Sequence, residues 1–381
     1  MTRVADSRAR VLLVESFSGG NAYGVELVRA LAQRVRLSVV TVDDTRLEPG
    51  DGARLLPVLP RFGGGQGRLR KLVRELRGVV RLAWELWRHR RDAVHVQSFR
   101  VTALEAPVYF ALRPFLRRLV VTAHNAVPHE PRAWHLAFFT RWYRLADRIQ
   151  VLSSHTRDRL VGELGVAPEK LLLAPHGNYE GFVARHPSDG GAACRSSFDI
   201  PQEARVVLFF GLLRPYKGVD RLLEAFELLA KVEDLYLVIA GAAAPAVARA
   251  LDAAIERSEA KARIRLRPRF STDPELAALL RMADIVVIPH AHVYQSGALL
   301  LAMSFGKAII ASDIPGLREY LDDGVEGVLC DTSKPTHLAR EILALAREDA
   351  RREALGAAAR EVSLESYAWE GIAQQIEEMY R

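Results

Sequence analysis

Cysteine is scarce in this chain, with only Cys194 and Cys330 among its 381 residues. A disulfide framework is therefore not expected, and a reducing cytosol is the compartment that fits such a composition. No apolar run reaches the roughly 18 residues that a membrane span requires. The residues from Met1 to Arg10 are too polar for a secretory signal. The sequence predicts a cytoplasmic globular protein.

Two common site motifs are also missing. The loop from Ser16 to Gly24 lacks the G-x-G-x-x-G spacing of a dinucleotide-binding fingerprint. No Asp-x-Asp pair follows a predicted strand, and His290 and His292 have no third ligand at a suitable spacing. We therefore expect neither a required metal nor a resident cofactor.

Short apolar runs alternate with helical patterns along the whole chain, which predicts parallel sheets with helices on both faces. The expected strands are 10–15, 37–42, 93–97, 119–123, 148–152 and 171–174, then 206–210, 236–240, 264–266, 285–289, 308–311 and 327–330. A polar stretch at 181–200 indicates a linker between the two series. We expect an N-terminal α/β domain over 1–185, a C-terminal one over 196–364, and an amphipathic helix at 365–381.

The most informative loop is Gly211 to Gly218, between the apolar run 206–210 and the helical pattern 219–229. Free backbone N–H groups and the start of a helix favour anions at such a place. Arg214 adds a forked guanidinium and Lys217 adds a point charge, and both suit phosphate oxygens. The loop is therefore predicted to bind a diphosphate.

Two further loops follow later strands of the second series. Ser296 and Gly297 begin a helix whose N-terminus can face the same diphosphate, although Ser296 can equally serve only as the N-cap. Glu319 is expected to start another helix after the strand 308–311. Its carboxylate can accept ribose or sugar hydroxyls there, or merely favour the helix start.

The first domain offers titratable groups after its predicted strands. His124 and Glu130 lie in one segment, and an imidazole or carboxylate there can take a proton from a hydroxyl as a general base. His124 can alternatively shape the turn, and His176 either touches a ligand or shapes the hinge. The loop after the first strand is expected to border the cleft with Gly19, Gly20, Asn21 and Tyr23.

The net charge of +7 is unevenly distributed. The segment from Arg68 to Asp92 holds nine Lys or Arg against three Asp or Glu. Apolar residues at helical spacing, including Trp84 and Trp87, run through it. We expect an amphipathic helix, either with a solvated basic face or lying on anionic head groups at the inner membrane face. Nucleic acid is not an expected partner, since no nucleic-acid motif accompanies the charge.

Several stretches resemble the GT-B nucleotide-sugar glycosyltransferases, and glycosyltransferase family 4 in particular. The loop GLLRPYKG is similar to the family's G-x-L-x-x-x-K-G, and residues 298–329 are similar to its A-M-x-x-G-K-P-V-I-A-S stretch. The resemblance implies two Rossmann-like domains that face each other across a cleft, with the helix at 365–381 packing back on the first. It also implies that Arg214 and Lys217 hold the donor's diphosphate, and that the backbone around Arg269 and Phe270 borders the nucleotide base.

Family 4 usually carries two glutamates around the donor loop, and this chain has Val293 and Leu301 at the matching positions. Three short stretches instead resemble the β-mannosyltransferases of exopolysaccharide assembly. They are Tyr294 to Gly297, 124–130 and 21–23. That resemblance implies inverting transfer from GDP-mannose to a polyprenyl-linked oligosaccharide, with Tyr294 and Glu319 near the donor. The expected protein is a metal-independent hexosyltransferase whose co-substrate is a nucleotide-diphosphate sugar.

Other functions remain as alternatives. A GT-B shell that binds nucleotide sugar or another transferase without chemistry fits the loss of both glutamates. A sugar-nucleotide epimerase has the same two-domain shape and needs no acceptor. A nicotinamide-dependent dehydrogenase is disfavoured, because the glycine spacing is wrong.

Overall fold

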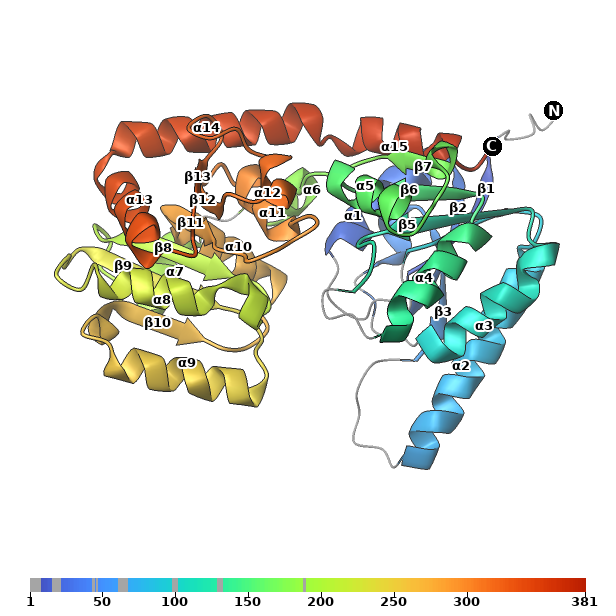
Figure 1. Cartoon of the computed structure of the whole chain (residues 1–381), viewed down its shortest axis with the longest axis horizontal. Helices are drawn as coiled ribbons and strands as arrows, with labels where there is room; N and C mark the ends of the chain where they lie inside the picture. Colours follow the sequence, from blue (N-terminus) through green and yellow to red (C-terminus); the bar gives the residue numbers. More distant parts are fainter. Residues whose placement is uncertain are drawn as a thin grey trace. The chain divides into compact units, whose positions relative to one another are not determined.

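The computed structural model describes residues 8–15, 22–42, 45, 47–60, 68–97, 102–128, 133–187 and 190–381. The chain divides into two compact units, which we call unit 1 (Met1–Gly177 with Trp369–Arg381) and unit 2 (Asn178–Ala368). Each unit is a parallel sheet between layers of helices (Figure 1). The predicted α/β class with two Rossmann-like domains is confirmed.

Unit 1 contains seven strands, all in parallel pairs, in the order β3-β2-β1-β4-β5-β6-β7. Its elements are β1 (Arg10–Val14), α1 (Ala22–Arg34), β2 (Arg36–Val42), β3 (Arg54–Leu59), α2 (Arg68–Arg88), β4 (Ala93–Val96), α3 (Thr102–Leu112), η2 (Arg113–Phe115), β5 (Arg118–Ala123), α4 (Ala133–Leu145), β6 (Arg148–Val151), α5 (Ser154–Gly162), β7 (Leu171–Leu173) and α15 (Trp369–Glu378).

The last helix of the chain belongs to the core of unit 1. α15 packs against α1, although almost the whole sequence separates them (Figure 1). Leu13 of β1, Leu27 of α1 and Ile372 of α15 share one buried apolar cluster. At the start of α15, a Cβ on Gly177 would lie 2.3 Å from the indole ring of Trp369. The backbone at residue 177 can therefore pass under Trp369 only as glycine.

Unit 2 contains six strands, again in parallel pairs, in the order β10-β9-β8-β11-β12-β13. Its elements are α6 (Glu180–Arg185), α7 (Gly191–Ser197), β8 (Arg205–Phe210), η4 (Pro215–Lys217), α8 (Val219–Glu227), β9 (Leu235–Ala240), α9 (Pro245–Arg257), β10 (Ile264–Arg267), α10 (Asp273–Met282), β11 (Ile285–Ile288), α11 (Gly297–Ser304), β12 (Ala308–Ser312), α12 (Pro315–Arg318), β13 (Val328–Cys330), α13 (Pro335–Arg347) and α14 (Asp349–Ser366).

The strand order places a switch point in each sheet. In unit 2 the chain runs outward from β8 through β9 to β10, then returns to pair β11 on the other side of β8. Loops that leave the carboxyl ends of two such neighbouring strands diverge, and ligands of open α/β sheets bind in the crevice between them. The loops after β8 and β11 therefore border the expected binding crevice of unit 2.

Three expectations about the elements need correction. The stretch 181–200 is no linker, because it contains most of α6 and all of α7, and both helices belong to unit 2. The helix expected over 365–381 is interrupted at Tyr367 and Ala368, where unit 2 ends. The strand β3 was not expected at all, since Pro57 interrupts its apolar run.

The contact between Gly177 and Trp369 predicts a stability effect. Gly177→Ala should lower the free energy of unfolding by about 1–3 kcal/mol, because the new methyl group must displace the indole. The midpoint of guanidinium unfolding, followed by tryptophan fluorescence, measures this. Gly162→Ala is the matched control in the same unit, where a Cβ meets nothing within 4 Å. Equal midpoints for the two variants would contradict the contact.

Candidate functional site

The loops after β8 and β11 are joined backbone to backbone. Gly218 has a φ of 70°, and a Cβ on it would lie 2.0 Å from the carbonyl oxygen of Pro289. The Ala291 N–H donates a hydrogen bond of 2.7 Å to the carbonyl oxygen of Tyr216. Side chains in the two loops are thereby held at one place, at the switch point of unit 2.

Lys217 is the central cation of this place. Its side chain is partly buried, and burial lowers the pKa of the ammonium group from its ordinary 10.5 to about 8. Its Nζ lies 3.8 Å from the position that a Cβ on Gly211 would take, so it reaches back over the end of β8. Arg214 is exposed and precedes η4. One cation is thus fixed near the sheet while the other faces solvent.

The start of α11 supplies further positive potential. Ser296 is buried and caps the helix, since its Oγ accepts the N–H of Leu299 at 3.2 Å. The N–H groups of Gly297 and Ala298 precede the first intrahelical hydrogen bond, so the helix itself leaves them without partners. Such groups, aligned with the helix dipole, attract anions. Capping by Ser296 and anion binding by this end of α11 are therefore compatible.

The other residues predicted near the donor differ in their surroundings. Tyr294 is buried. Arg269 is exposed and is bonded to Glu275 at 2.6 Å, while Phe270 is 53% exposed. Glu319 was expected to start a helix, but it is the C-cap of α12 and its side chain is exposed. The helix begins earlier because Pro315 provides its first residue.

In unit 1, the predicted residues that the structure describes gather around Tyr23. The Tyr23 ring lies 4.5 Å from His176, 5.3 Å from His124 and 5.4 Å from Trp369, measured between ring centroids. Burial lowers the pKa of His124 to about 4 and that of His176 to about 3. Both imidazoles are therefore neutral at physiological pH. Gly19, Gly20, Asn21 and Glu130 lie outside the described residues.

The sequence did not predict the buried polar side chains next to His124. Gln97 is buried after β4, and its amide group lies 3.2 Å from Nε2 of His124. His95, two residues earlier, is fully buried and also meets the Gln97 amide, at 3.1 Å. Because His95 and Gln97 are two positions apart, their side chains lie on the same face of the strand. Two polar residues on one face of an otherwise apolar run were the available signal.

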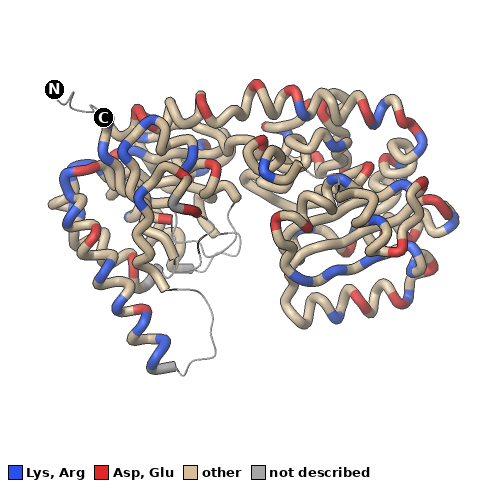
Figure 2. The backbone as a smooth tube through the Cα atoms, turned by 180° about the vertical axis from the view of Figure 1, so that it is seen from behind, with Lys and Arg blue, Asp and Glu red and all other residues tan. Residues whose placement is uncertain are grey.

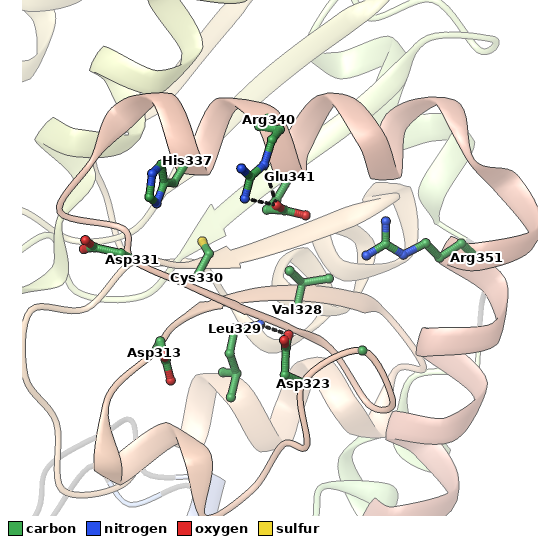
Figure 3. Close-up of a pocket in the computed structure, with 11 residues that line it drawn as sticks. Asp313, Asp323, Val328, Leu329, Cys330, Asp331, His337, Arg340, Glu341 and Arg351 are labelled. Carbon is green, nitrogen blue, oxygen red and sulfur yellow. Dashed lines mark hydrogen bonds and ion pairs between the residues drawn. The ribbon is translucent and has the colours of Figure 1, made fainter.

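A surface pocket of about 410 Å³ lies elsewhere in unit 2, at the edge strand β13 (Figure 3). None of the predicted site residues lines it. Its charged lining residues are Asp313, Asp323, Asp331, His337, Arg340, Glu341 and Arg351. Arg340 is bonded to Glu341 at 2.8 Å, so part of its positive charge is already compensated. The excess of carboxylates opposes binding of a diphosphate in this pocket.

No group of three or more His, Cys, Asp or Glu side chains in the described part of the chain is arranged to hold a metal ion. Among the helices that the structure describes, none is both long and apolar enough to span a membrane.

Both units of the chain are similar to known protein families and solved structures. The family model of glycosyl transferases group 1 matches residues 193–362, and that of Glycosyltransferase Family 4 matches residues 17–177. The solved structure of a glycosyltransferase from Rickettsia africae has a TM-score of 0.77 at 16% identity, with 98% of each chain covered. Anabaena HepE in complex with UDP and glucose has a TM-score of 0.77 at 19% identity, covering 97% of this chain and 98% of that one. The fold is that of GT-B glycosyltransferases.

Curated relatives agree with this class. A D-inositol 3-phosphate glycosyltransferase of Xylanimonas cellulosilytica is 30% identical over 241 residues, which cover 62% of this chain and 57% of that protein. A GDP-mannose:glycolipid 4-beta-D-mannosyltransferase of Xanthomonas campestris pv. campestris is 29% identical over 196 residues, 51% of this chain and 49% of that protein. The matches thus span about half the length of these relatives. One segment of the chain thus matches Glycosyltransferase Family 4 and the other matches glycosyl transferases group 1, a combination that supports a GT-B glycosyltransferase similar to family 4.

The contact between the loops after β8 and β11 gives a second prediction. Gly218 and Gly324 both have a positive φ, of 70° and 78°, so alanine at either should cost about 1–2 kcal/mol of backbone strain. Only Gly218 also faces a backbone atom, whereas a Cβ on Gly324 meets nothing within 4 Å. Gly218→Ala should therefore destabilise by at least about 1 kcal/mol more than Gly324→Ala. Urea unfolding measures the difference, and equal losses would disprove the close approach.

Proposed function

We propose that this protein transfers a hexose from a nucleotide-diphosphate sugar to a hydroxyl group of a glycan or lipid-linked oligosaccharide. The observation that carries the proposal is that the loop holding Lys217 and the loop leading into α11 are bonded to each other. A leaving diphosphate gains negative charge as the sugar departs. A prepositioned ammonium group and free N–H groups stabilise that charge most where water is partly excluded.

We further propose GDP-mannose as the favoured donor. The donor-loop stretch from Tyr294 to Gly297 supports this, because it resembles β-mannosyltransferases rather than the two-glutamate pattern of family 4. The relative from Xanthomonas, whose name specifies GDP-mannose and a glycolipid acceptor, supports it as well. In this proposal the donor binds unit 2 and the acceptor binds unit 1. Arg214 assists Lys217 in neutralising the diphosphate, so that no metal is needed for that task.

The first test removes the fixed cation. Lys217→Ala should lower turnover on the order of 10²-fold, as the loss of a prepositioned donor to a developing anion does. Release of GDP from GDP-mannose, in the presence of a polyprenyl-diphosphate-linked oligosaccharide, is the measurement. Lys231→Ala, at an exposed lysine of the same unit, is the control that should keep full turnover. Full turnover of Lys217→Ala would refute the diphosphate site.

The same lysine makes binding depend on pH in a defined direction. Free Lys217 loses its proton around pH 8, and a bound diphosphate favours the protonated form. GDP affinity should therefore fall as pH rises above about 8, with proton uptake on binding. Calorimetric titration with GDP in two buffers of different ionisation heat counts these protons. Lys217→Arg, which stays charged, should abolish the uptake.

The helix α2 supports a further proposal, that the protein docks on the anionic inner face of a membrane. Its buried face contacts α3 and β3. A second apolar stripe at helical spacing is exposed, and it consists of Val73, Leu76, Val80, Trp84 and Trp87. Beside it run Arg70, Arg77, Arg81 and Arg88 at spacings of seven, four and seven. Figure 2 shows basic residues recurring along the helix. An apolar stripe flanked by cations suits anionic lipid head groups.

Vesicle binding tests the membrane surface. The wild-type protein should cosediment with vesicles that contain phosphatidylglycerol, less with pure phosphatidylcholine, and less at high salt. The double variant Val80→Ser/Trp84→Ser should lose most of this binding. Leu228→Ser, at a residue of unit 2 that is 57% exposed, should keep it. Binding that ignores lipid charge, or survives the double variant, would rule out this face.

A further inference from the structure

A row of buried polar side chains crosses the sheet of unit 1 and ends at His124. The row consists of buried side chains from neighbouring strands, namely Gln150 of β6, Thr122 of β5, His95 of β4 and Gln97 after β4. The hydroxyl group of Tyr380 forms a further hydrogen bond with His95. Polar groups buried this deeply need matched donors and acceptors. The position of each proton in the row can therefore be worked out from one fixed end.

That fixed end is the carbonyl oxygen of Ala174, which can only accept. The amide nitrogen of Gln150 donates to it at 3.1 Å, so the other amide atom, Oε1, must face Thr122. The Thr122 hydroxyl donates its only hydrogen to Gln150 Oε1 at 2.9 Å. Toward its remaining neighbour, Thr122 can only accept.

That neighbour is Nε2 of His95, 2.8 Å from Thr122 Oγ1. Nε2 must therefore carry a hydrogen and donate it. Burial lowers the pKa of His95 to about 3, so its ring is neutral and has one N–H only. The other ring nitrogen, Nδ1, then accepts the hydroxyl hydrogen of Tyr380 at 2.7 Å. His95 is thus fixed with its proton on Nε2.

The Gln97 amide transmits this arrangement to His124. One end of the amide lies 3.1 Å from His95 Nε2 and the other lies 3.2 Å from His124 Nε2. A protonated His95 Nε2 has no lone pair to accept an amide N–H, so the Gln97 amide must turn its oxygen toward it and share the Nε2 hydrogen with Thr122 in a three-centre hydrogen bond. A half-turn about the terminal bond exchanges the two ends of an amide without changing its shape. The amide nitrogen then donates to His124 Nε2, and the His124 proton is left on Nδ1.

We propose that this row fixes neutral His124 with its hydrogen on Nδ1, and that Gln97 and Thr122 are positioning residues for it. Within the described part of the chain, Nδ1 of His124 has no hydrogen-bond partner, so it can serve a ligand. The Nδ1–H group can donate a hydrogen bond to the oxygen of a sugar hydroxyl or of a phosphate group. His124 is then not the general base. This role in transfer rests on the proposed function, but the proton position does not.

Nitrogen NMR of the full-length protein, labelled with ¹⁵N-histidine and free of substrate, tests the proton position directly. The His124 signals, identified by their loss in His124→Phe, should show a protonated Nδ1 and an unprotonated Nε2. Thr122→Val keeps the side-chain shape but breaks the row, so the fraction of His124 with Nδ1–H should fall. Thr41→Val is the matched control, at another buried threonine of unit 1, and should leave the signals unchanged.

The Tyr380→Phe variant provides a second NMR test of the proton position. It removes the donor to His95 Nδ1 but leaves the fixed end at Ala174 intact, so the His124 proton should stay on Nδ1. A wild-type His124 protonated on Nε2 would overturn the inference, as would a Thr122→Val spectrum identical to the wild type. Should either variant fail to fold, the wild-type spectrum still decides. The expected spectrum without any sugar transfer would defeat the proposed function alone.

Discussion

The approach of Gly218 to the carbonyl of Pro289 is the constraint on which the proposed donor site depends. It locks the loop after β8 to the loop after β11, and only a residue without a Cβ permits it. The ammonium group of Lys217 and the free N–H groups of α11 come from these two loops. Neither group alone makes a diphosphate site. In the proposed function it is their fixed neighbourhood that binds the diphosphate, because charge stabilisation is strongest when the dipoles need not reorganise.

The two units use burial in opposite ways. In unit 2, burial lowers the pKa of Lys217 to about 8 but leaves it mostly charged at neutral pH, so an arriving anion relieves a desolvated cation. In unit 1, burial lowers the pKa of His124 to about 4 and keeps it neutral. One site therefore supplies charge, while the other supplies a directed hydrogen bond whose polarity is fixed by its neighbours.

Much of the architecture was predictable from local patterns, since twelve of the thirteen strands coincide with apolar runs. The missing one, β3, contains Pro57, which a central strand would not tolerate. β3 lies at the edge of the sheet, where one side needs no donor. Gln97 was missed for a different reason. The polar residues on one face of β4 were a local signal, but their partners come from the pairing of β4 with β5 and from Tyr380 after α15, which no local pattern identifies.

The docking of α15 into unit 1 has a consequence for synthesis on the ribosome. Residues 178–368 form a continuous unit that can close its own core as soon as they emerge. Unit 1, although its first strand is made early, lacks Ile372 and its neighbours until the whole of unit 2 has been translated. Domains usually fold in the order of their synthesis. Here the core of the N-terminal unit is completed only once α15 has been made, after the core of unit 2.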